Sequence, residues 1–224
     1  MKKLNQFITE KFRLSKDNLN SKYNYFPETR DELQKLVKKL IKERGNNADL
    51  NDIDTSEITD MFGIFSWEKF NGDISEWNVS NVENMNTMFM HSKFNGDISK
   101  WNVSKVENMH GMFAGAEFDG DVSKWNVSNV KYAGYMFSGS KFNGDISNWN
   151  VSNVENMEAM FKDSIFNRDI SQWDISNVKN MKEMFLGSEF NQDISNWNTS
   201  NVKDMRYMFN NSPLAKNPPA WYKE

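Results

Sequence analysis

The chain has 224 residues, of which 38% are hydrophobic, 14% aromatic and 26% charged, a composition typical of one globular or repeat domain and not of a disordered or collagen-like chain. It has no cysteine, which excludes a disulfide framework, a thiolate zinc site and a cysteine nucleophile, and its two histidines leave little material for catalysis. Residues 1–45 hold twelve Lys or Arg against six acids and the remainder fifteen against twenty-five, so a basic head precedes an acidic body.

The head, residues 1–45, is predicted to be a basic helical cap. Leu4, Phe7, Ile8 and Phe12 indicate an amphipathic helix near residues 2–13. A second helix is predicted over residues 29–44, with Thr29 and Glu32 as a capping box and Gly45 as the stop. No stretch has the unbroken apolar run of a signal peptide or a membrane helix, so we expect a cytoplasmic or virion-associated protein rather than one on the cell surface.

A 24-residue repeat fills residues 46–213. The pattern Phe-Asn-Gly-Asp-Ile-Ser-x-Trp-Asn-Val-Ser-Asn-Val begins at Phe70 and, with few substitutions, returns every 24 residues to Phe190, after one degenerate copy. Such a fixed period predicts a solenoid, whose units bury their apolar edges only by stacking on one another. Seven of the eight tryptophans share one register and are expected to form a buried structural ladder: Trp77, Trp101, Trp125, Trp149, Trp173, Trp197 and Trp221.

Each unit is predicted to hold a strand and then a helix. Trp77-Asn78-Val79-Ser80 alternates apolar and polar residues, as a strand does, and Val82, Met85, Met88 and Phe89 follow at helical intervals. Ser80 with Glu83 reads as a capping box for that helix. The predicted fold class is therefore an α/β repeat solenoid of strand-helix coils behind an N-terminal helical cap. Residues 214–224, with Leu214, Trp221 and Tyr222, are predicted to cap the last coil.

The spacing Ile-x-x-Trp-x-Val followed by Val-x-x-Met resembles that of leucine-rich repeats. More closely, the unit Phe-Asn-x-Asp-Ile-Ser-x-Trp-Asn-Val-Ser-Asn-Val-x-Asn-Met-x-x-Met-Phe resembles the repeat of BspA-like bacterial surface proteins and mycoplasma lipoproteins, over roughly residues 48–213. The resemblance implies a right-handed, leucine-rich-repeat-like solenoid and a role in surface adhesion or interaction. Those proteins commonly carry an export signal and often a lipid-anchor cysteine, and this sequence shows neither. We therefore favour a phage-encoded or cytoplasmic relative.

Two polar registers accompany the apolar ones. The first is a ladder of six aspartates, for which we favour Asx turns over calcium because calcium needs six to eight converging oxygens: Asp73, Asp97, Asp121, Asp145, Asp169 and Asp193. The second is Asn78 and its equivalents, which begin Asn-x-Ser sequons and for which we favour an amide ladder over glycosylation. No histidine register accompanies the repeated serines, and no phosphate-binding or nucleic-acid-recognition motif is present, so we expect no enzyme, cofactor, metal site or nucleic-acid partner.

The predicted function is non-enzymatic: a protein-binding or structural module, with carbohydrate or cell-surface glycan binding through exposed aromatics as the alternative. Binding would use residues that differ among otherwise identical copies. Those on the helix side are Asn86-Thr87, His110-Gly111, Gly134-Tyr135, Glu158-Ala159, Lys182-Glu183 and Arg206-Tyr207, of which Tyr135 and Tyr207 are the expected anchors. Those on the strand side are Glu76, Lys100, Lys124, Asn148, Gln172 and Asn196.

One copy breaks the pattern. Ala133 stands where the other regular copies have methionine, and Tyr132 replaces an asparagine. Because an unfilled cavity of that size destabilises a core, we expect Tyr132 to fold inward and occupy the space.

Overall fold

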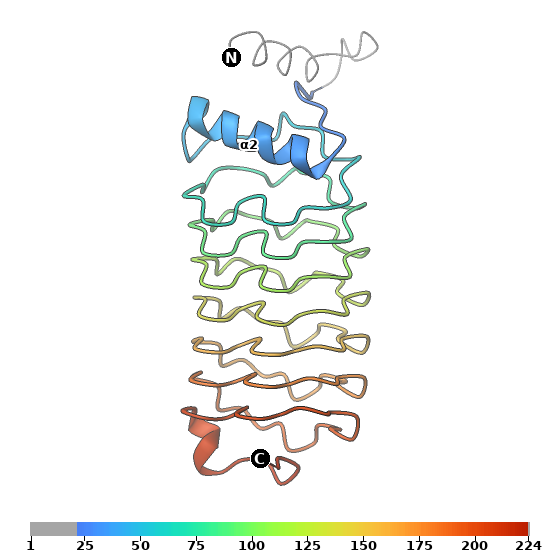
Figure 1. Ribbon diagram of the computed structural model, residues 1–224, viewed down its shortest axis with the longest axis vertical. Helices are drawn as coiled ribbons and strands as arrows, with labels where there is room; N and C mark the ends of the chain where they lie inside the picture. The colour runs from blue at the N-terminus through green and yellow to red at the C-terminus, as the bar shows by residue number, and fades with distance from the viewer. Residues whose placement is uncertain (1–21, 224) are drawn as a thin grey trace.

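A computed structural model describes residues 22–223 of the chain. Figure 1 shows a stack of coils, with helix α2 (Arg30–Arg44) across its N-terminal end and the short 3-10 helix η2 (Pro213–Lys216) at its C-terminal end. Single parallel bridges join neighbouring coils at one position in each coil: Asp60, Asn84, Asn108, Tyr132, Asn156, Asn180 and Asp204. The bridged residues of this series are 24 positions apart, so the period of the sequence is the length of one coil.

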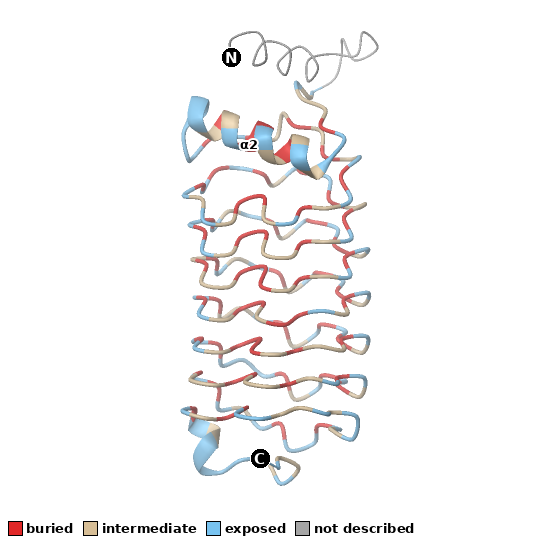
Figure 2. Ribbon diagram, in the orientation of Figure 1, coloured by how far each residue is buried: buried red, intermediate tan, exposed pale blue. Residues whose placement is uncertain are grey.

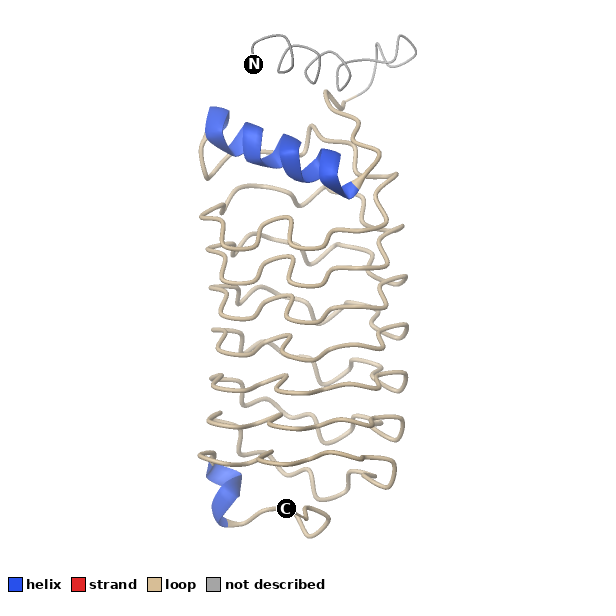
Figure 3. Cartoon of the chain, in the orientation of Figure 1, coloured by secondary structure: helices blue, strands red, loops and turns tan. Residues whose placement is uncertain are grey.

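The predicted α/β class is wrong. The described residues contain α2 and η2 but no strand, and Figure 3 draws the coils as loops and turns throughout. The molecule is thus a stack of irregular coils and not a right-handed, leucine-rich-repeat-like solenoid of strand-helix units.

The strand predicted over residues 77–80 does not form, and the first and last of its backbone N–H groups bond within their own coil. The Trp77 N–H group donates to the Ile74 carbonyl at 3.1 Å, and the Ser80 N–H group donates to Asn78 Oδ1 at 3.1 Å. Such turns compete with sheet formation, because an N–H group used locally cannot pair with a neighbouring strand. The alternation still buries Trp77 and Val79, but it does so without a ladder.

The helix predicted after Val82 is a run of turns. The Met88 N–H group donates to the Met85 carbonyl, three residues back, at 3.2 Å, whereas the Thr87 and Phe89 N–H groups donate to carbonyls of the next coil at 2.8 and 2.9 Å. Thr87 has a φ of 52° and the residue four positions later, His91, a φ of 54°. A turn that repeats every four residues places apolar side chains at intervals of three and four, as a helix does, so Ser80 caps no helix.

Helix α2 is where the sequence predicts it. Thr29 Oγ1 accepts the Glu32 N–H group at 3.3 Å, and the Glu32 carboxylate accepts the N–H group of Glu28 at 3.0 Å, one residue before the position that a capping box requires. Gly45, with a φ of 91°, ends the helix. The helix predicted near residues 2–13 lies outside the described residues.

The core is a column of stacked aromatic rings (Figure 2 shows the recurring buried positions). One phenylalanine ladder has ring centroids 5.5–6.0 Å apart and consists of Phe65, Phe89, Phe113, Phe137, Phe161, Phe185 and Phe209. A second has centroids 6.2–6.4 Å apart and consists of Phe70, Phe94, Phe118, Phe142, Phe166 and Phe190. Offset stacking of this kind adds to the free energy gained by burial.

The tryptophans join successive coils by hydrogen bonds. Each indole Nε1–H group donates to a backbone carbonyl 27 residues earlier, at 2.9–3.2 Å, from Trp77 to Leu50 up to Trp221 to Ile194. Six of these side chains are buried, and Trp221, on the last coil, is partly buried. A buried indole therefore has its polar group satisfied while its rings fill the core.

Tyr132 does not fill the gap beside Ala133. Its side chain is 47% exposed, so the expectation that it folds inward is wrong. An apolar cavity of about 10 Å³ is left in the core, with Met109, Ala133 and Met157 among its lining residues. Tyr132 holds the bridging position, whose residue is not buried in any of the coils.

The apolar core is covered at both ends of the stack. At the first coil, α2 buries Leu33 and Leu40 and Arg30 donates from Nε to the Phe62 carbonyl at 3.0 Å. At the last coil, Leu214, Trp221 and Tyr222 pack against the core.

Candidate interaction surface

A groove of about 620 Å³ opens on the turns of three neighbouring coils. We call it the turn groove, and it is lined by Thr87, Met90, His91, His110, Gly111, Ala114, Gly115, Tyr135, Ser138 and Gly139. Each coil has two positions with positive φ, four residues apart, and in these three coils glycine occupies three of the six, namely Gly111, Gly115 and Gly139. Gly139 leaves part of this groove open, because a Cβ atom there would meet no other atom within 4 Å.

Two of the glycines in this region make room for histidines. A Cβ atom on Gly115 would lie 2.2 Å from Nδ1 of His91, so the imidazole occupies the space where a side chain would be. A Cβ atom on Gly134 would similarly lie 3.1 Å from Nδ1 of His110. Each imidazole therefore rests on the backbone of the following coil.

Each histidine also contacts an aromatic ring. The ring centroids of Trp67 and His91 are 4.1 Å apart, and those of His110 and Tyr135 are 5.3 Å apart. Trp67 is 68% exposed, whereas Tyr135 is half-buried. The rim of the groove thus presents flat, weakly polar groups whose positions are fixed by their neighbours.

The surroundings of His110 and Tyr135 shift both pKa values in the direction that favours the uncharged form. Burial lowers the pKa of His110, and the Glu158 carboxylate opposes this shift only in part. Burial also raises the pKa of Tyr135, as does the nearby Glu158, whose Oε1 accepts the phenol hydroxyl at 3.3 Å. A neutral imidazole can both donate and accept a hydrogen bond.

A cluster of charges lies beyond Tyr135. Lys162 and Lys182 pair with Glu183 at 2.7 and 3.3 Å, and Lys182 also lies 3.7 Å from Glu158. The opposite charges within these pairs neutralise each other. Lys182 also helps to hold the Glu158 carboxylate, which accepts the Tyr135 hydroxyl.

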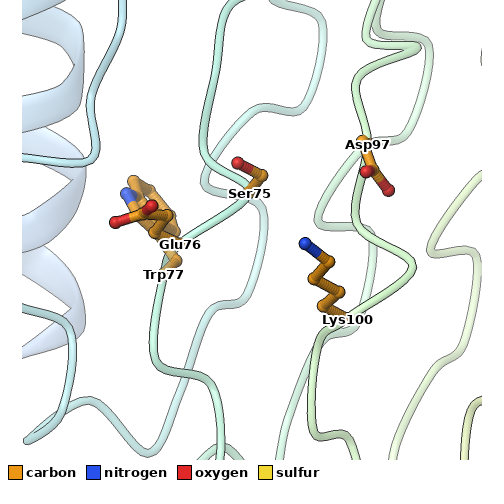
Figure 4. A pocket seen from close by; sticks show the side chains of 5 residues that line it. All are labelled: Ser75, Glu76, Trp77, Asp97 and Lys100. Atoms are coloured by element: carbon orange, nitrogen blue, oxygen red, sulfur yellow. The ribbon is translucent and has the colours of Figure 1, made fainter.

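The strand-side residues lie on a different surface. Glu76 and Lys100 line a hollow of about 340 Å³, in which Lys100 and Asp97 belong to one coil and Ser75, Glu76 and Trp77 to the other (Figure 4). Gln172 and Asn196 line a second hollow, of about 400 Å³. Lys124 and Asn148 are exposed between the two.

The six aspartates on this surface form Asx turns. In each, Oδ1 accepts the N–H group of the serine two residues later, at 2.8–2.9 Å. This hydrogen bond is the main reason that the pKa of each carboxyl lies below its usual value. The described residues contain no group of three or more His, Asp or Glu side chains arranged to hold a metal ion.

The amide ladder predicted for Asn78 and its equivalents is wrong. The Asn78 side-chain oxygen accepts the N–H and hydroxyl groups of Ser80, so it too forms a turn within the coil. Asparagines three positions later join the coils instead, because their Nδ2 groups donate to a serine carbonyl of the preceding coil: Asn81, Asn129, Asn153, Asn177 and Asn201.

Of the predicted anchors, only Tyr135 lines the turn groove. Tyr207, at the equivalent position of the last coil, is 48% exposed and lies outside it. Sequence reasoning singled out Thr87, His110-Gly111 and Tyr135 but missed Met90-His91, Ala114-Gly115 and Ser138-Gly139. These pairs also differ among the copies, and that variation is the signal that could have revealed them.

The comparisons with known proteins give a family. A family model described as "Mycoplasma protein of unknown function, DUF285" matches residues 32–141 and again residues 117–221. No curated protein and no solved structure matches the chain. Within residues 22–223, no helix is both long and apolar enough to cross a bilayer.

Proposed function

We propose that this chain, which belongs to the DUF285 family of mycoplasma proteins of unknown function, is a non-enzymatic module that binds a polypeptide partner in the turn groove. The observation that carries the proposal is the groove itself. Gly111, Gly115 and Gly139 leave out side chains in two neighbouring coils, and His91, His110 and Tyr135 line the resulting gap.

The floor of the groove favours recognition by side chains. The Gly111 and Gly115 N–H groups already donate to carbonyls of the next coil, at 2.8 and 2.7 Å. A partner therefore finds no free backbone N–H groups at these two residues and must contact Met90, Ala114 and the rim. Apolar contact with a few fixed hydrogen-bonding groups suits the side chains of a polypeptide.

The rim supplies anchors of the kind that dominate protein interfaces. Tyrosine is enriched among the residues that contribute most to binding. Tyr135 is held by its hydrogen bond to Glu158 and by the His110 ring, so little side-chain entropy is lost when a partner contacts it.

One observation supports the alternative, glycan binding. Trp67 is 68% exposed and contacts His91, which lines the groove. A sugar ring would stack on this indole, whereas a polypeptide anchored in the groove would depend more on Tyr135. Selecting ligands from a random peptide library and from a glycan array, and measuring each against Trp67→Ala and Tyr135→Ala, separates the two functions.

The chain contains a matched control for this experiment. Tyr135 and Tyr207 hold the same position in their coils, with φ values of 58° and 60°, but only Tyr135 lines the groove. We expect Tyr135→Ala to weaken the binding of a selected peptide by at least about tenfold, as loss of an anchor does, and Tyr207→Ala to leave it unchanged. Equal effects of the two substitutions, or peptides that bind a different surface, would reject the groove.

A further inference from the structure

The last coil ends in an unpaired row of backbone donors. In the coil before it, alternate N–H groups donate to carbonyls of the last coil at 2.8–3.0 Å, namely those of Met181, Glu183, Phe185 and Gly187. The equivalent N–H groups of the last coil have no acceptor among the described residues, and they belong to Met205, Tyr207, Phe209 and Asn211. We call these four groups the donor edge.

The donor edge keeps the conformation that pairs elsewhere in the stack. The N–H groups between its members are bonded within the coil, as in every other coil: Met208 donates to the Met205 carbonyl at 3.2 Å and Asn210 to the Tyr207 carbonyl at 3.2 Å. Tyr207 and Asn211 also keep the positive φ of their positions, 60° and 58°. The edge is therefore formed before any partner arrives, which lowers the entropy lost on binding.

The C-terminal residues do not satisfy these donors. Pro213 begins η2 and turns the chain away from the path of another coil. Trp221 and Tyr222 pack on the Phe209 ring, with centroids at 6.0 and 5.0 Å, but no residue of this segment accepts a hydrogen bond from the donor edge.

We propose that the donor edge binds a segment of another protein that carries a repeat of this same kind, aligned parallel to the last coil. Such a segment places carbonyl groups on alternate residues in the register that every earlier coil uses. A row of unpaired backbone groups is a template for pairing with another chain, and main-chain hydrogen bonds then supply affinity.

A side chain adds specificity to this edge. In the first coil Asp60 Oδ1 accepts Nδ2 of Asn84, from the next coil, at 2.9 Å. Asp204 holds the same position in the last coil, where its carboxylate pairs with Arg206. Both oxygens of the Asp204 carboxylate already accept from Arg206, at 3.0 and 2.7 Å. An asparagine at the matching position of the incoming segment, the usual residue there in this repeat, therefore binds this carboxylate only by displacing part of the Arg206 pairing.

A second copy of this chain is a poor occupant. Two copies related by a two-fold axis would set N–H groups against N–H groups at this edge. End-to-end stacking would need the carbonyls of the first coil, but α2 covers that end and Arg30 already donates to the Phe62 carbonyl. The partner must bring an uncovered repeat.

The test uses a synthetic peptide of residues 178–189, whose own carbonyls accept the N–H groups of the preceding coil in the structure. Amide hydrogen exchange of the full chain is measured by NMR with and without about 1 mM peptide, enough to detect weak binding. We expect exchange at Met205, Tyr207 and Asn211 to slow by at least about fivefold near saturation. Unchanged exchange at these amides overturns the proposal, as does protection confined to other coils.

An ester-containing peptide is the matched control. Replacing the amides of residues 183 and 185 by esters weakens the carbonyl acceptors of residues 182 and 184, while the N–H groups that are lost point away from the donor edge. This peptide should bind at least about fivefold more weakly. Equal binding would show that backbone pairing is not the basis of recognition, and protection that rises with protein concentration alone would identify a second copy as the occupant.

Discussion

Trp125 offers a direct test of how neighbouring coils are joined. Its side chain is 3% exposed, and its Nε1–H group donates to the Ile98 carbonyl at 3.1 Å. Trp125→Ala empties a large core position, which costs about 3–5 kcal/mol. Loss of the hydrogen bond adds only about 1 kcal/mol, because the same carbonyl keeps the N–H group of Trp101 as a donor. The expected loss is therefore about 4–6 kcal/mol.

Two further variants divide this loss into its parts. Trp125→Phe keeps one ring in the core but removes the hydrogen bond, so about 2 kcal/mol should be lost. Trp221→Ala should cost less than Trp125→Ala, since Trp221 is only partly buried and has a neighbouring coil on one side. Urea unfolding followed by circular dichroism measures all three, with the m value checked because repeat proteins can depart from two-state unfolding. A loss below about 1 kcal/mol for Trp125→Ala would refute the reasoning.

Three other predictions follow from the core and the turns. Ala133→Met should fill the apolar cavity and raise the free energy of unfolding by about 1 kcal/mol, and a decrease would mean that the coil is too tight for methionine. Tyr132→Ala should change stability by less than about 0.5 kcal/mol, because the side chain is exposed; a large loss in the melting temperature would place it in the core after all. The six aspartates of the Asx turns have lowered pKa values, so their ionised carboxylates stabilise the fold fully above about pH 4, and this stabilisation should be lost as the pH falls through the lowered pKa values: Asp73, Asp97, Asp121, Asp145, Asp169 and Asp193. EDTA at pH 7 should leave the melting temperature unchanged. Melting curves from pH 6 to pH 2.5 and with EDTA check both, and a large effect of EDTA would point to a bound metal instead of Asx turns.

The sequence predicts which side chains are buried far better than it predicts the backbone between them. Ile74, Trp77, Val79, Met85 and Phe89 are all buried, as their periodicity indicates. Burial follows from apolar periodicity, and apolar periodicity is visible in a single sequence. The helix over residues 30–44 was also predictable, since its N-cap, apolar face and final glycine are all local signals.

The conformation of the coils was not predictable from the same pattern. Turns that recur every four residues bury the same positions as an α-helix. In a helix every N–H group would bond within its own coil, whereas in these turns alternate N–H groups bond to the next coil. In the sequence, only glycines such as Gly111 and Gly115 indicate the two positive-φ positions of a coil. The neighbouring coils have Thr87, His91 and Tyr135 at these positions, so the positive φ cannot be recognised from their residue types. Hydrogen bonds between the coils hold these residues at positive φ.

The groove was predictable only in part. Variation among copies singled out Tyr135, but a hollow depends on which side chains are missing from adjacent coils. That in turn depends on a register in which His91 lies over Gly115, a contact between residues 24 positions apart.

Blocking the groove with a side chain tests the proposed function most directly. Gly111 holds the position of Tyr135 one coil earlier and has a similar φ, 60°, so Gly111→Tyr places in the groove a residue that this position accepts in the next coil. The measurement is the Kd of a peptide selected on the parent chain, with melting curves to confirm that the variant is folded. We expect the folded Gly111→Tyr chain to bind at least about tenfold more weakly, because its phenol ring fills the space that the partner needs. A folded variant that binds with the parental Kd would contradict the assignment of the turn groove as the binding site.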